Sequence, residues 1–211
     1  MKCLGEVERC GVERELFHGR PQVECVSFDL VIVQASHSFK SSVACGFRTQ
    51  EELEHMPGTQ DEFEHWLFEM DDRLDELISF LPSEAASRMD FSADSLSVIE
   101  AWLLNEYSSP VDLLRKSEKT VIDMVARYVG ETFRRNLGGT WRLELSNKQS
   151  VFYGLPVIEK FGLWTECPVS LVTAATDRRS GIFMGGVLNA IASCHGISVR
   201  KKEGKWFSAG E

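Results

Sequence analysis

The sequence lacks any long apolar run. Nowhere in its 211 residues does a stretch approach the roughly 18 consecutive apolar residues that a bilayer-spanning helix needs. Residues 1–6 have neither the apolar core nor the cleavage pattern of a secretory signal. These absences predict a cytoplasmic protein with no membrane-inserted segment.

Basic charge is also scarce. Lys and Arg number 23 against 32 Asp and Glu, so the formal net charge is −9. Because nucleic-acid binding depends on a basic surface that neutralises phosphates, this balance argues against DNA or RNA as the partner. It permits a basic partner, and many basic partners are themselves proteins.

The motifs that hold metals, nucleotides or nucleophiles are missing. The six cysteines are scattered with no Cys-x-x-Cys pair, which is typical of reduced structural cysteines in a cytosolic chain. Gly185-Gly186 lacks the lysine and the serine or threonine of a phosphate-binding loop. We therefore expect no cofactor, no metal and no assembled catalytic group.

What the chain does have is a helical middle. Apolar residues at spacings of three and four predict helices over Phe63–Leu81, over Ser92–Tyr107 with Ser92 as N-cap, and over Glu118–Leu137 with Ser117 as N-cap. Gly138-Gly139 predict a glycine stop in the left-handed region after the third helix. A strand is expected to begin at Trp141.

Strand patterns flank these helices. Alternating apolar residues predict strands over 23–34 and 42–47 near the N-terminus. Toward the C-terminus we expect short strands over 151–153 and 169–174 and a hairpin over 197–207, while 182–191 fits either a helix or a strand. The predicted class is α+β, with three main helices packed on a mostly antiparallel sheet formed by N- and C-terminal strands. Residues 1–45 form an N-terminal β segment and 46–211 the main domain.

From about Gly46 onward the chain resembles an uncharacterised family of small bacterial proteins. The matching pieces are the Trp66–Leu81 helix, Glu100-Ala101-Trp102-Leu103, Tyr128–Trp141, Phe152–Pro156 and Pro168–Arg179. The Tyr-x-Gly-Glu and Gly-Gly-x-Trp arrangement within 128–141 is also similar to that of bacterial toxin-immunity and accessory domains. No activity is assigned to the uncharacterised family. The small size, an acidic helical face and the lack of an assembled catalytic group predict a protein-binding role, with a toxin-neutralising or accessory role as its most concrete form.

An acidic helical face is the first candidate site. Residues 51–76 hold eleven acids and a single base, Arg73. We expect Glu62, Glu69, Asp72 and Glu76 to steer a basic partner, with Phe68 and a loop residue, Trp164, as apolar contacts. Glu62-x-x-His65 matches metal-ligand spacing, but with no second such motif a solvated acidic face is the favoured interpretation.

The second candidate is a small-ligand or enzymatic pocket at the junction of the third helix and the sheet, lined by Tyr128, Glu131, Arg135 and Trp141. The spacing also predicts surface ion pairs between Glu131 and both Arg127 and Arg135. If Glu131 is buried, it must be paired, which favours a structural role. A structural subunit of a larger assembly is a third possibility.

The segment Asp177-Arg178-Arg179 has two interpretations. It is most simply an exposed turn, and its alternative is a recognition loop whose arginines grip a carboxylate or a phosphate.

Overall fold

The computed structural model describes residues 56–160 and 163–199, all of which belong to one compact unit. Its elements, in chain order, are α2 (Gln60–Phe68), α3 (Met70–Phe80), α4 (Ser83–Ala86), α5 (Ala93–Glu106), α6 (Pro110–Leu113), a 3-10 turn (Lys116–Glu118), α7 (Lys119–Leu137), β1 (Thr140–Leu143), β2 (Pro156–Lys160), β3 (Trp164–Glu166), α8 (Pro168–Arg178) and α9 (Phe183–Cys194). The strands predicted over 23–34 and 42–47 lie outside the described residues.

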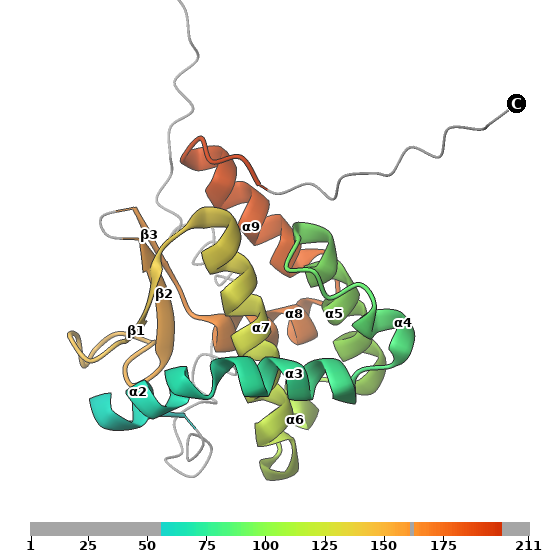
Figure 1. Ribbon diagram of the computed structural model, residues 1–211, viewed down its shortest axis with the longest axis horizontal. Coiled ribbons are helices and arrows are strands. Elements are labelled where there is room, and N and C mark those ends of the chain that lie inside the picture. Colours follow the sequence, from blue (N-terminus) through green and yellow to red (C-terminus); the bar gives the residue numbers. More distant parts are fainter. Residues whose placement is uncertain (1–55, 161–162, 200–211) are drawn as a thin grey trace, which may run out of the picture. The chain divides into compact units, whose positions relative to one another are not determined.

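Helix α7 forms the centre of the fold. It packs against α3, α5, α8, α9 and β2, and every residue from 121 to 133 is buried (Figure 1). The amphipathic pattern predicts a single buried face, and that prediction is too narrow because α8 and α9 cover the opposite side. A helix buried all round must pair its polar residues internally, and α7 carries several of them.

The sheet is small and antiparallel. Its three strands run in the order β1-β2-β3, with Trp141 opposite Ile158 and Ile158 opposite Glu166. The α+β class and the antiparallel pairing are therefore confirmed for the described residues. The three-helix count is wrong, because the described part of the chain is mostly helical and holds further helices on both sides of α7.

The largest error lies at residues 169–174, where a strand is predicted and α8 is found. Pro168 occupies the first turn of this helix, where its missing N–H costs nothing. A short run of apolar residues that is buried on several sides shows neither the two-residue period of a strand nor the 3.6-residue period of a helix. The sequence pattern therefore fits both structures. Residues 151–153 form a turn, and the described part of the predicted hairpin, residues 197–199, contains no strand.

Helix boundaries follow local chemistry more closely. The Ser92 hydroxyl caps α5 by accepting from the Ser95 N–H, as predicted. Gly138 and Gly139 have φ of 79° and 102°, and β1 begins directly after them. The Ser117 prediction is wrong, because a 3-10 turn precedes α7 and puts Glu118 at the N-cap position.

The single helix predicted over Phe63–Leu81 is divided at Glu69 into α2 and α3. Its apolar stripe nevertheless faces inward, and its buried members are Phe63, Trp66, Met70, Leu74, Leu77 and Leu81. None of the helices in the described ranges combines the length and apolar content needed to cross a bilayer.

Candidate functional site

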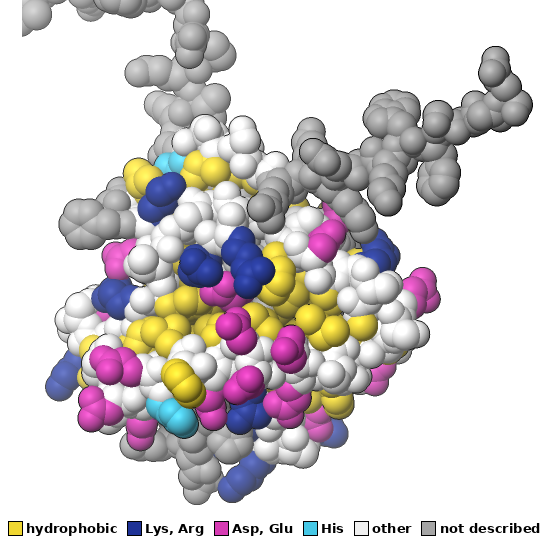
Figure 2. Space-filling view, viewed as in Figure 1, with side chains coloured by type: hydrophobic (Ala, Val, Ile, Leu, Met, Phe, Trp, Pro, Cys, Tyr) yellow, Lys and Arg dark blue, Asp and Glu magenta, His cyan; other side chains and the backbone are white. Residues whose placement is uncertain are grey.

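The outer surface of α2 and α3 is acidic, and the most exposed aromatic ring on these helices is that of Phe68. Asp and Glu side chains gather where these helices run (Figure 2). Phe68, the last residue of α2, is 84% exposed, as its position off the apolar stripe allows. Asp72 is also exposed, one helical turn further along the chain. The structure thus brings an apolar contact and carboxylates together on one surface.

Glu62 has a structural task on this surface. Its carboxylate accepts from the N–H groups of Gly58 (2.8 Å) and Thr59 (3.0 Å), and the Thr59 hydroxyl accepts from the Glu62 N–H. This reciprocal capping box satisfies free donors at the start of α2. The hydrogen bond from Gly58, followed by those from Thr59, lowers the pKa of Glu62. The Glu62 carboxylate is therefore engaged in capping the start of α2.

The other acidic candidates surround Arg73. Arg73 lies 2.7 Å from Glu76 and 4.0 Å from Glu69, and His65 lies 3.6 Å from Glu69. These are exposed contacts within one helical surface, each of which contributes little to stability. No group of three or more His, Cys, Asp or Glu side chains in the described ranges could hold a metal ion.

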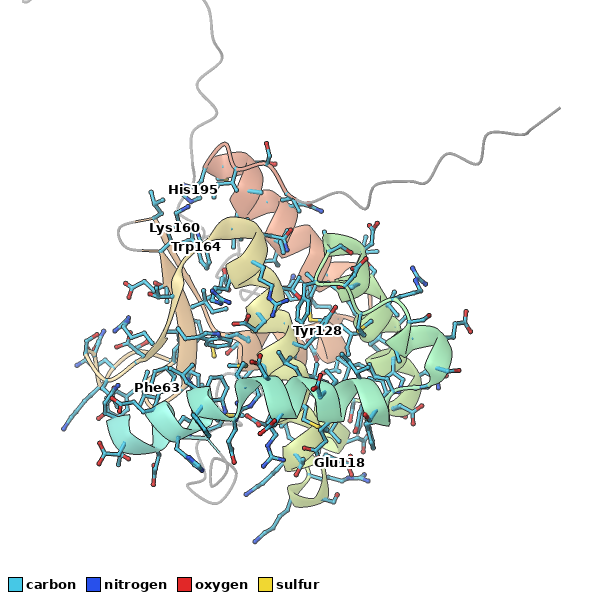
Figure 3. The ribbon with its side chains drawn as sticks, in the orientation of Figure 1. Phe63, Glu118, Tyr128, Lys160, Trp164 and His195 are labelled. Atoms are coloured by element: carbon cyan, nitrogen blue, oxygen red, sulfur yellow. The ribbon has the colours of Figure 1, made fainter. Side chains whose placement is uncertain are left out.

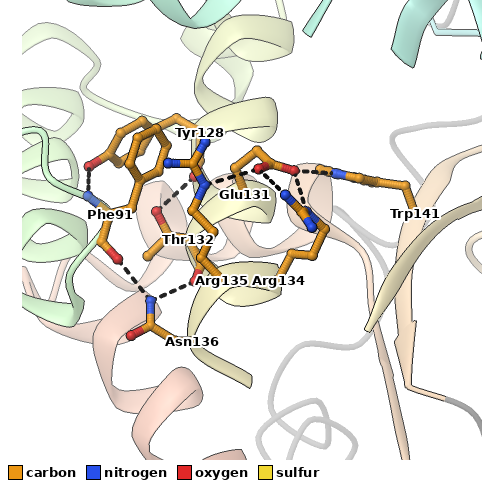
Figure 4. Close-up of polar contacts among 8 residues, drawn as sticks. All are labelled: Phe91, Tyr128, Glu131, Thr132, Arg134, Arg135, Asn136 and Trp141. Carbon is orange, nitrogen blue, oxygen red and sulfur yellow. Dashed lines mark hydrogen bonds and ion pairs between the residues drawn. The ribbon is translucent and has the colours of Figure 1, made fainter. Parts of the chain in front are cut away.

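Glu131 is the centre of a second cluster (Figure 4). Its side chain is 5% exposed and accepts from Arg134 at 2.7 and 2.9 Å, from Arg135 at 3.2 Å and from the Trp141 indole N–H at 2.8 Å. Burial opposes ionisation of this carboxylate, but the hydrogen bonds from Arg134 and Trp141 outweigh it and hold the pKa of Glu131 below its ordinary value. Glu131 is therefore an ionised, fully engaged group.

Aromatic stacking continues this cluster toward α5. The guanidinium of Arg135 lies 3.6 Å from the ring centroid of Phe91, and that ring stacks on Tyr128 at 4.9 Å. The Tyr128 hydroxyl donates to Ser95 at 2.7 Å and accepts from the Phe91 N–H at 3.1 Å. Burial raises the pKa of Tyr128. Phe91 itself has a positive φ of 57°, and Asn136 donates to its carbonyl oxygen at 2.8 Å.

Of the four predicted pocket residues, Arg135 and Trp141 bond to Glu131, whereas Tyr128 is linked to them only through the Phe91 ring. Tyr128 is fully buried, whereas Trp141 is half-buried and the Arg135 side chain is 37% exposed. Phe91 also belongs to this cluster, through its contacts with Arg135 and Tyr128. Its position just before α5 in the sequence does not indicate these contacts.

Arg127 has a different partner from the one predicted. It donates to Asp123 at 2.8 Å instead of pairing with Glu131, and its guanidinium covers the Trp66 ring at 3.9 Å. Trp66 donates its indole N–H to Asp123 at 2.8 Å. Arg127 is 1% exposed, so this group ties α2 to α7 inside the core. In the sequence, the i,i+4 spacing of Asp123 and Arg127 indicates this ion pair.

Trp164 lies in β3, so the prediction of a loop is wrong. It is 8% exposed and stands opposite Lys160 across the β2–β3 pair, where Figure 3 labels both residues. A buried ring offers no anchor to a partner on this surface.

The turn predicted over 177–179 is wrong, because Asp177 and Arg178 form the end of α8 and Arg179 is its C-cap. One of the two arginines of that segment, Arg179, is also engaged. Arg179 donates to the carbonyl oxygens of Leu104 (2.7 Å), Tyr107 (2.8 Å) and Ser108 (3.1 Å) at the end of α5. In return Glu100 of α5, which is fully buried, accepts from the N–H groups at the start of α9. The segment between α8 and α9 is thereby fastened to α5.

No protein-family model matches this chain, and neither a curated protein nor a solved structure shows significant similarity to it.

Proposed function

We propose that this chain is a cytoplasmic bacterial protein that acts by binding a basic partner protein through the outer surface of α2 and α3. The observation that carries the proposal is the 84% exposure of Phe68 in a surface made largely of carboxylates. Single exposed apolar residues are common. An aromatic ring on a mostly acidic surface, however, fits an interface in which electrostatics sets the association rate and the ring supplies contact area.

The most concrete version is neutralisation of a toxin. A protein that inhibits by covering a basic active surface needs acidic side chains and a rigid support, and α3 is packed directly on the central helix α7. Asp71, Asp72 and Asp75 are exposed on α3. We assign the steering to these residues with Glu69 and Glu76, and we leave Glu62 out because it caps α2.

A small-ligand site around Glu131 is the alternative function. It is favoured by the half-exposed guanidinium groups of Arg134 and Arg135. The closed hydrogen bonding of Glu131 favours a structural role for that carboxylate, so the protein-binding proposal stands first.

The test is affinity purification of the tagged protein from its native host, followed by binding kinetics with the purified partner. The variant Asp71→Lys/Asp72→Lys/Asp75→Lys is compared with Glu84→Lys/Glu106→Lys/Asp177→Lys, which makes the same charge change at exposed positions elsewhere. We expect the α3 variant to associate roughly tenfold more slowly at low salt, and the control variant to retain most of the rate. Equal losses in both variants, or recovery of no basic protein, would overturn the proposal.

A further inference from the structure

One face of the molecule carries three neighbouring zones of different character. Figure 2 shows a band of hydrophobic side chains, with Asp and Glu along the border where α2 and α3 run and a Lys/Arg group on the opposite border. We call these the acidic rim, the apolar band and the basic rim. The basic rim lies over the C-terminal half of α7, whose last turn carries Arg134 and Arg135.

The basic rim is held in place before any ligand arrives. Arg134 is fixed by two hydrogen bonds to Glu131, and Arg135 is fixed by one hydrogen bond to Glu131 and by its contact with the Phe91 ring. Their side chains are 41% and 37% exposed. Within the described residues, the two terminal nitrogens of Arg135 have no hydrogen-bond partner. One buried carboxylate between two arginines leaves a net positive charge, and a guanidinium edge of this kind matches a carboxylate.

The apolar band lies beside this group. Phe91 and Trp141 are half-buried and stand on the two sides of Glu131, in contact with Arg135 and with Glu131 respectively. Trp141 continues inward to the Trp66 ring at 5.1 Å. These two half-buried rings are thus an edge of the core next to the basic rim, and the contact between Trp141 and Trp66 supports it from below.

We propose that this face binds an amphipathic helix of the partner protein, with its apolar side on the band, a Lys/Arg flank on the acidic rim and an Asp/Glu flank on the basic rim. The proposal rests on the function proposed above and specifies the partner's element. The argument for a helix is charge complementarity on both sides of an apolar strip, since a helix presents one apolar stripe between two polar flanks. Turning a helix end for end exchanges its flanks, so the two unlike rims also fix its direction.

The test uses two synthetic peptides of about 14 residues, roughly 21 Å long as helices, which have the same apolar stripe. One carries Lys along one flank and Glu along the other, and the second carries Gln on both flanks. Both have zero net charge, so the net charge of the protein does not favour either. Binding of each labelled peptide to the full chain is followed by fluorescence anisotropy at low and high salt.

We expect the charged peptide to bind about tenfold more tightly at low salt and to lose that advantage at high salt. Arg135→Gln should remove most of the advantage, while Lys148→Gln, an exposed site in the β1–β2 loop, should preserve it. Thermal unfolding of both variants checks that the fold is retained.

Equal affinity for both peptides, no binding of either, or an advantage unaffected by Arg135→Gln would overturn the helix proposal. The partner purification and the α3 variants give a separate result that does not depend on the peptides. Failure of the helix proposal is therefore distinguishable from failure of the proposed function.

Discussion

The indole ring of Trp141 lies directly against the backbone of α7 at Gly130. A Cβ at position 130 would overlap the six-membered part of that ring. The ring has little room to retreat, because its N–H is bonded to Glu131 and its face meets the Trp66 ring edge-on. The glycine, placed within a helix where it is otherwise unfavourable, is therefore what allows β1 to pack against α7.

Gly130→Ala should lower the free energy of unfolding by about 1–3 kcal/mol, because the ring or the strand must shift. The control is Gly186→Ala in α9, where an added Cβ meets nothing within 4 Å; it should stabilise the protein by about 0.5–1 kcal/mol. Urea unfolding at neutral pH measures both variants. Equal effects of the same sign would contradict this account of Gly130.

Glu131→Gln should cost about 1–3 kcal/mol at neutral pH, because it leaves two arginines without their carboxylate. The pKa of Glu131 in the folded protein lies below its ordinary value of 4.5. Its ionised form therefore stabilises the fold above that ordinary value, and this contribution is lost as the pH falls toward the lower folded pKa. The difference in unfolding free energy between wild type and variant should shrink as the pH is lowered below about 4.5.

Unfolding curves for the Glu131 variant at several pH values would measure this dependence. Glu84→Gln, at an exposed site, is the control for the loss of a surface carboxylate. A pH-independent cost of Glu131→Gln would mean that its charge contributes nothing and that only shape is lost.

Local patterns in the sequence predicted the structure correctly where it depends on residues that are close together in the chain. Ser92 caps α5, Gly138 and Gly139 end α7, and Glu131 pairs with Arg135 one turn away. Each of these depends on a handful of adjacent positions. The acidic surface and the position of Phe68 off the apolar stripe followed from the helical period for the same reason.

Contacts between distant segments could not be predicted. Phe91 reaches Arg135, and Glu100 reaches the Met184 N–H across 84 positions. Strands β2 and β3 are too short for alternation to distinguish them from loops, and Trp164 was misplaced as a result. Burial of α7 on all sides likewise depends on α8 and α9, which come later in the chain.

Substitutions of two phenylalanines on α2 should distinguish an effect on partner binding from an effect on stability. Phe68→Ala should change stability by no more than about 0.5 kcal/mol, because its ring is exposed. Phe63→Ala should cost about 3–5 kcal/mol, because that ring is 3% exposed and stacks on Trp66. If the binding proposal is correct, Phe68→Ala also speeds dissociation of the partner, as surface plasmon resonance would show. A large loss of stability in Phe68→Ala would place this ring in the core.

Cys167 should be unreactive in the folded protein. Its side chain is fully buried, and burial raises the pKa of the thiol to about 11. Because the thiolate is the reactive form, iodoacetamide at mildly alkaline pH should leave Cys167 unmodified until urea unfolds the chain. Peptide mass spectrometry would locate the label. Modification of Cys167 under native conditions would indicate that α8 opens readily.

Glu100 should control the start of α9. Its two carboxylate oxygens accept from the N–H groups of Phe183 and Met184, each at 3.0 Å, and the helix has no side-chain cap of its own. Glu100→Gln replaces one acceptor with an N–H donor facing a buried N–H, a cost of about 1–3 kcal/mol. Hydrogen exchange should accelerate at the first turn of α9 before it changes in α7. Ser180→Ala, which removes a 3.3 Å contact to the same carboxylate and a 3.4 Å hydrogen bond from the Ile182 N–H, should have a smaller effect. Unchanged protection at Phe183 and Met184 in Glu100→Gln would show that α9 begins without this carboxylate.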